Sequence, residues 1–209
     1  MEDKYLNDIS EIKNMMSKSS QFISLSGFSG ILAGIYAIIG AFMAFNILYI
    51  ENEFFDDIYY RIISLNDMYK LFGIAFTVVT LSIITGIVLS VNKAKKNNEV
   101  VWNITSKRLV INFLIPLVVG GYLCMYLIEK EDFTLIAPLT LIFYGLACVN
   151  ASKYTVGDVR YLGLTMIILG ILNTFFIGFG LLFWALGFGG CHILYGSMMY
   201  FKYDFRKKN

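Results

Sequence analysis

The sequence predicts an all-α fold: a polytopic transmembrane bundle of six helices, with both termini in the cytoplasm and an amphipathic helix before the first span. The 209-residue chain is 57% hydrophobic and 15% charged, whereas about a quarter of the residues are charged in a typical soluble domain. It also contains six apolar runs without Asp, Glu, Lys or Arg, each about as long as the ~20 residues that a helix needs to cross the hydrocarbon core. The runs are continuous rather than alternating, which favours helices over barrel strands.

The predicted spans cover residues 22–49, 71–92, 109–128, 133–152, 161–177 and 181–201. With a cytoplasmic amphipathic segment at 1–21 and a basic cytoplasmic tail at 202–209, they form a single membrane domain, 1–209, because no interval between spans could bury its own core. Of the 17 basic residues, all except Arg61, Lys70 and Lys130 then lie on the cytoplasmic side. The positive-inside rule therefore predicts that both termini are cytoplasmic.

Two segments outside the spans have helical spacing of apolar residues. Residues 6–16 carry Leu and Ile at intervals of three, followed by two methionines, with charges between them. This pattern predicts an amphipathic helix on the inner interface. Residues 55–63 repeat the spacing and predict a short interfacial helix on the opposite side. Either helix anchors the chain to the membrane or, alternatively, docks a partner or acts as a lid.

Span 1 has a ridge of small residues, because Ser26, Gly30 and Gly34 recur every four positions. Such a ridge lets another backbone approach closely. It packs within the bundle or, alternatively, forms a homodimer through Gly30 and Gly34. Pro116 is predicted to kink span 3, whereas Pro138 lies near the start of span 4. The Asn-Ile-Thr tripeptide that begins at Asn103 matches a glycosylation sequon, but it falls in a cytoplasmic loop and is interpreted as a chance match.

His192 is the only histidine in the chain. Its neighbours on one helix face would be Phe188, Gly189, Tyr195 and Gly196, which supply no second metal ligand from the same helix. We expect a neutral, buried histidine that is hydrogen-bonded to a tyrosine, an asparagine or a carbonyl of a neighbouring helix. The alternatives are a haem or metal centre completed by other spans, and a ligand-binding or pH-sensing role.

Polar side chains inside the spans are the other candidates for a site. The candidate ligand-binding residues are His192, Tyr195, Asn112, Asn173, Tyr144 and Tyr36. Each could instead be one half of an interhelical hydrogen bond. The Ser and Thr residues of span 2 do not share one face, which weakens a pore interpretation. The spans contain no paired carboxylates, second histidine or phosphate-binding loop, so no catalytic residue, metal site or cofactor is predicted.

Three stretches carry a resemblance to known proteins. "SLSGFSGILAGIYAIIGA", "YGLACVNASKYTVGDVRYLG" and "FWALGFGGCHILYG" resemble uncharacterised bacterial six-span integral membrane proteins, over most of the chain. This resemblance implies a multi-pass protein of the bacterial cytoplasmic (inner) membrane and carries no activity. "LGLTMIILGILNTFFIGFGLLFWALGFGGCHILYG" is faintly similar to hairpins of the acid-resistance membrane protein (HdeD-like) family, without the proline expected between those paired helices.

The sequence therefore favours a non-enzymatic integral membrane protein that binds lipid or a small apolar ligand, or interacts with a membrane partner. The alternative from another class is a facilitative transporter or channel for a neutral solute, and a third hypothesis is a haem or metal redox protein that uses His192. The basic, aromatic tail "YFKYDFRKKN" is predicted to lie against anionic inner-leaflet lipid, with a protein partner as the alternative. The net charge of +2 gives no indication of a nucleic acid partner.

Overall fold

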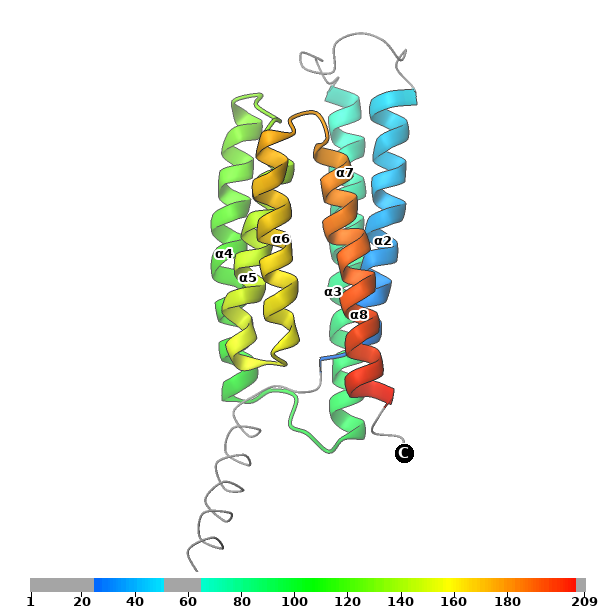
Figure 1. Cartoon of the computed structure of the whole chain (residues 1–209), viewed down its shortest axis with the longest axis vertical. Coiled ribbons are helices and arrows are strands. Elements are labelled where there is room, and N and C mark those ends of the chain that lie inside the picture. The colour runs from blue at the N-terminus through cyan, green and yellow to red at the C-terminus, as the bar shows by residue number, and fades with distance from the viewer. Residues whose placement is uncertain (1–24, 51–64, 206–209) are drawn as a thin grey trace, which may run out of the picture.

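The computed structural model describes residues 25–50 and 65–205, and these fold as helices with no strand among them (Figure 1). Within them, the helices long and apolar enough to cross a membrane are Gly27–Leu48, Asn66–Lys96, Ile104–Glu129, Ile136–Tyr154, Asp158–Phe175 and Gly180–Asp204. Each overlaps one predicted span, so the predicted all-α class with six membrane-spanning helices is confirmed. The predicted amphipathic segment at 1–21 and the interfacial helix at 55–63 lie outside the described residues.

The first five spans are regular α-helices for most of their length. Their bounds are α2 (Gly27–Phe45), α3 (Leu65–Lys96), α4 (Ile104–Glu129), α5 (Ile136–Ala151) and α6 (Asp158–Phe175). A π-helical turn, η1 (Asn46–Ile50), extends α2, and a 3₁₀ turn, η2 (Ser152–Tyr154), follows α5. The last helix alternates between α and π geometry, as α7 (Gly180–Trp184), η3 (Ala185–Cys191), α8 (His192–Met199) and η4 (Tyr200–Phe205).

The helices form two groups of three (Figure 1). In one, α5 packs between α4 and α6; in the other, α2 packs between α3 and the last helix. The last helix also contacts α5 and α6 and thereby joins the two groups. Because α3 packs mainly on α2, and α4 mainly on α5, each leaves most of its apolar surface uncovered, as expected of helices that face lipid.

Glycines set the closest helix contacts in both groups. A Cβ on Gly34 would lie 2.7 Å from the Gly189 carbonyl oxygen, and a Cβ on Gly30 would lie 3.1 Å from Gly196 Cα. The small-residue ridge of span 1 thus faces the last helix of the same chain. A second copy could reach Gly30 and Gly34 only after this helix had moved away.

The helices α3 and α4 extend beyond their uncharged runs, and the charged side chains at their ends can keep their heads in water at the interface. At the start of α4, the Asn103 side chain accepts a hydrogen bond from the Ser106 backbone N–H, and the Ser106 hydroxyl accepts one from the Asn103 N–H, both at 2.8 Å. This capping box gives the sequon-like tripeptide a structural role.

The two prolines have different positions in their helices. The helix α4 continues through Pro116 as one α-helix. Pro138 is the third residue of α5 and is buried. A proline in the first turn costs little, because the backbone N–H groups there have no partner within the helix.

The two ends of the bundle differ in charge. One end, which we call the basic end, carries the described residues Lys93, Lys95, Lys96, Lys107, Arg108, Lys153, Arg160 and Lys202. Its acidic residues in the described chain are Glu99, Asp158 and Asp204. The opposite end, the acidic end, carries Asp67, Glu129, Glu131 and Asp132, with Lys70 and Lys130.

Ion pairs hold the C-terminal part of the last helix at the basic end. Lys93 of α3 pairs with Asp204 and also donates to the Leu25 carbonyl oxygen at 2.8 Å. The second Asp204 carboxylate oxygen accepts the Gly27 N–H at 3.2 Å, at the start of α2. We call this set the Lys93–Asp204 clasp. Lys202, which the tail prediction placed against lipid, pairs with Asp158 at 2.9 Å.

Candidate functional site

His192 lies at the start of α8 and is 8% exposed. Its Nε2 is 2.7 Å from the Tyr144 hydroxyl of α5, and its Nδ1 is 3.1 Å from the Gly187 carbonyl oxygen. A carbonyl oxygen can only accept, so Nδ1 donates, and Nε2 of the neutral ring then accepts from the tyrosine hydroxyl. The expected buried, hydrogen-bonded histidine is therefore confirmed, with a tyrosine as its partner.

The π-helical segment η3 brings the Gly187 carbonyl to the histidine. Gly187 precedes His192 by five residues, the spacing that π geometry brings into register. A Cβ on Gly187 would lie 2.5 Å from Leu141 Cδ2 of α5. The absence of a side chain at Gly187 therefore lets α5 come close enough for Tyr144 to reach the ring.

Aromatic rings surround the pair. The Tyr144 ring meets Phe113 and Phe188 edge-on, with centroid distances of 5.8 and 5.1 Å. Phe188 in turn lies against His192 and Trp184. The pair is thus a packed polar joint between the last helix and α5, the helices through which the two groups meet.

Asn112 and Tyr195 make their hydrogen bonds outside this joint, although Tyr195 packs with Tyr144 against the cluster of Leu141, Leu162 and Met166. Asn112 donates from Nδ2 to the Arg108 carbonyl of its own helix at 2.8 Å, and its own carbonyl accepts the Asn150 amide at 2.9 Å. The Tyr195 hydroxyl is 3.5 Å from the Thr165 hydroxyl.

Asn173 and Tyr36 complete the set of candidates. Tyr36 is half-buried on α2. Asn173 is 2% exposed on α6, and its Nδ2 has no hydrogen-bond partner among the residues that the structure describes. A buried amide donor without a partner costs about 1–3 kcal/mol. Bound water is a common partner for such a group.

The hydroxyls of span 2 bond to their own helix. Thr77 donates to the Gly73 carbonyl and Ser82 to the Val78 carbonyl, each at 2.7 Å. Thr85 likewise donates to the Leu81 carbonyl. This i−4 pattern is common for Ser and Thr in helices. These hydroxyls are satisfied within α3 and need no polar path through the bundle.

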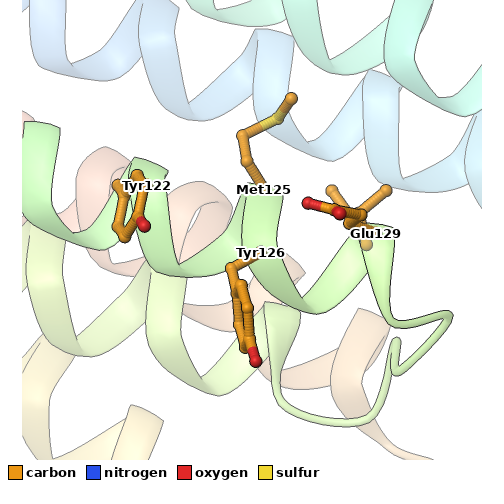
Figure 2. Close-up of a pocket in the computed structure, with 5 residues that line it drawn as sticks. Tyr122, Met125, Tyr126 and Glu129 are labelled. Carbon is orange, nitrogen blue, oxygen red and sulfur yellow. The ribbon is translucent and has the colours of Figure 1, made fainter.

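A hollow of about 360 Å³ lies on the last two turns of α4 (Figure 2). It is lined by Tyr122, Met125, Tyr126, Ile128 and Glu129. Tyr122 is 71% exposed and Tyr126 50% exposed, so both rings are open to the surroundings of the bundle at its acidic end. Tyrosines are enriched at membrane interfaces, because the ring is apolar and the hydroxyl is wet.

The C-terminal turn of α4 holds this region in one conformation. The Glu131 N–H donates to the Ile128 carbonyl at 3.0 Å, and the Asp132 N–H donates to the Leu127 carbonyl at 2.9 Å. Together with the positive φ of 58° at Glu131, these bonds form a Schellman motif. Next to it, the Lys130 ammonium is 5.6 Å from the Tyr126 ring centroid.

Tyr122 is one of the polar side chains inside the spans that could line a pocket, but none of the residues that line the hollow was among the six candidate ligand-binding residues. Most of the candidates lie in the middle of spans, whereas the hollow lies at the end of one. The available signal was Tyr122 and Tyr126, one turn apart, followed at once by Glu129 and Lys130. In the part of the chain that the structure describes, no three His, Cys, Asp or Glu side chains lie close enough to hold a metal ion.

The hydrogen bond across the joint should be measurable as coupling between its partners. We expect Tyr144→Phe and His192→Leu to destabilise the protein together by about 1 kcal/mol less than the sum of the single variants, because either change removes the same bond. Thermal unfolding in a mild detergent measures the three values. Tyr144→Phe combined with Tyr161→Phe, an exposed tyrosine on α6, is the control and should be additive. Additivity in the test pair would contradict the bond.

No protein-family model, curated protein or solved structure matches this chain. The resemblance to bacterial six-span proteins therefore stays a prediction, and the function is inferred from the contacts of the chain itself.

Proposed function

We propose that this chain is a non-enzymatic integral membrane protein that binds a membrane lipid on the outer surface of α4. The observation that carries the proposal is the hollow formed by Tyr122, Met125, Tyr126, Ile128 and Glu129. It has a volume of about 360 Å³ and is open along the outer face of one helix, and its lining is mostly apolar with a few polar groups.

The surface of α4 below the hollow suits an acyl chain. Ile111, Ile115 and Val118 are exposed and precede Tyr122 at helical intervals of three and four, so they continue the face of the hollow. From Glu129 back to Val118 the helix rises about 16 Å, close to half of the ~30 Å hydrocarbon core. A lipid in one leaflet could thus place its headgroup at the hollow and a chain along this face.

A facilitative transporter or channel, the alternative from the sequence, gains no support from α3, whose hydroxyls bond to their own backbone. A homodimer through Gly30 and Gly34 is also not favoured, since the last helix covers these residues. Lipid binding is therefore the function that these contacts favour.

Native mass spectrometry after extraction in mild detergent tests the proposal. We expect bound phospholipid on the wild-type protein and a loss of retention on the order of tenfold, equivalent to ~1.4 kcal/mol, for the double variant Tyr122→Ala/Tyr126→Ala. Tyr161→Ala removes an exposed tyrosine at the basic end and is the matched control, with retention unchanged. A lipid-free wild-type mass, equal losses in both variants, or a visible absorption band from a bound cofactor would contradict the proposal.

We also propose that the basic end faces the bacterial cytoplasm, as the excess of Lys and Arg there supports. In a background without the three native cysteines, a membrane-impermeant maleimide should label Thr134→Cys at the acidic end in intact cells. Lys95→Cys at the basic end should be labelled only after lysis. The reverse pattern would place the termini on the outside.

A further inference from the structure

We propose that the hollow on α4 binds the headgroup of a zwitterionic phospholipid with a primary amine, such as phosphatidylethanolamine. The ammonium lies on Glu129, at the end of the hollow that the two tyrosine rings continue along α4, and the phosphate lies on the neighbouring Lys130. This inference rests on the proposed function and specifies its ligand.

Negative charge at the end of α4 favours a cationic headgroup. Glu129 is exposed, and within the described residues it forms no ion pair. Figure 2 shows its carboxylate directed back along α4 toward the rest of the hollow. Glu131 and Asp132 add negative charge directly after the helix. An anionic headgroup would meet repulsion here, whereas an ammonium group would meet attraction.

The pair of tyrosine rings also favours a cation. Tyr122 and Tyr126 are one helical turn apart, and both line the hollow. The face of an aromatic ring attracts a cation within about 6 Å. The Tyr126 ring already lies 5.6 Å from the Lys130 ammonium, which places the ring within reach of positive charge at this end of α4. An ammonium held by Glu129 would gain the same kind of attraction.

Lys130 supplies a positive charge for the phosphate of the headgroup. Lys130 is the C-cap residue of α4, one residue beyond Glu129, and it is exposed. The Schellman turn fixes the backbone on which both charges stand. The helix end therefore presents an anion and a cation next to each other, which complements the two charges of a zwitterionic headgroup.

Hydrogen bonding to Glu129 distinguishes a primary amine from a quaternary one. A primary ammonium carries N–H groups that can donate to the Glu129 carboxylate, and hydrogen bonds between charged groups are the stronger ones. A trimethylammonium group has no N–H and keeps only the Coulomb and ring contributions. The expected order of affinity is phosphatidylethanolamine, then phosphatidylcholine, then phosphatidylglycerol.

The experiment compares these three lipids, with identical acyl chains, by native mass spectrometry of the delipidated full-length protein in mild detergent. We expect wild-type protein to prefer phosphatidylethanolamine over phosphatidylglycerol by roughly five- to tenfold, as one ring contact and one charge contact allow. Glu129→Gln keeps the shape of the side chain and should remove this preference. Glu131→Gln removes a charge two residues away that does not line the hollow, and should keep it.

The outcomes separate the two proposals. If wild-type protein binds all three lipids equally well, or if Glu129→Gln keeps the preference, the headgroup inference is wrong and lipid binding stands. If the protein retains none of the three lipids, the proposed function itself is wrong. If Glu129→Gln and Glu131→Gln reduce the preference equally, the acidic end attracts amines by its general charge, and the specific role of Glu129 is overturned.

Discussion

Gly163→Ala is expected to destabilise the protein by about 1–3 kcal/mol, and Gly163→Val by more, because overpacking a tight contact forces backbone shifts. A Cβ at Gly163 would lie 2.7 Å from the Gly145 carbonyl oxygen and 2.9 Å from the Val149 amide nitrogen of α5. Both are backbone atoms, so no side-chain rotation relieves the clash. Thermal unfolding in mild detergent should show a large fall in the melting temperature.

Gly86→Ala on α3 is the matched control, because a Cβ there would meet no other atom within 4 Å. Replacing glycine by alanine inside a helix stabilises it by up to about 1 kcal/mol in water, so the control should unfold at the same or a higher temperature. Equal destabilisation by Gly86→Ala and Gly163→Ala would contradict the close packing of α5 on α6.

Asp204→Asn is expected to cost roughly 3 kcal/mol, at the lower end of the range for breaking a buried ion pair. The Lys93 and Asp204 side chains are only 15% and 14% exposed, so the remaining lysine would be a poorly solvated, unpaired charge. The start of α2 would also lose the negative charge of the group that accepts the Gly27 N–H. Thermal unfolding in mild detergent measures the loss.

A variant without either charge distinguishes the stability that the ion pair contributes from the cost of leaving one buried charge unpaired. The double variant Lys93→Met/Asp204→Leu should recover part of the stability, because it leaves no buried charge without a partner. Lys202→Gln breaks the ion pair between Lys202 and Asp158, in which the lysine side chain is 52% exposed. We expect a much smaller effect there, since solvent screens exposed pairs. If Lys202→Gln were as damaging as Asp204→Asn, the clasp would have no special role.

The number and the approximate extent of the helices could be predicted from the sequence, because lipid imposes a length and an apolar composition on any helix that crosses it. The helix that packs against the Gly30–Gly34 ridge could not be predicted. The spacing shows that some backbone can approach, but it does not distinguish the last helix of the same chain from a second copy. That choice depends on packing across more than 150 residues of sequence.

The site was harder to predict for two physical reasons. The bond between His192 and Tyr144 was foreseeable as a type, but the π-helical segment η3 that brings the Gly187 carbonyl to the ring has no clear sequence signal. The hollow on α4 depends on side chains at the end of the span, where tyrosines and charges are the ordinary composition of an interface. Only their arrangement around a concave surface separates them from a simple membrane anchor.

Photo-crosslinking with a bifunctional phosphatidylethanolamine tests the central claim most directly. The full-length protein is reconstituted in vesicles that contain the probe, irradiated and digested, and the modified peptides are identified by mass spectrometry. Lipid binding at the hollow predicts labelling concentrated on residues 118–130 of α4 and reduced in Tyr122→Ala/Tyr126→Ala. Labelling spread evenly over the uncovered faces of α3 and α4, and unchanged in that variant, would contradict a lipid site on this surface.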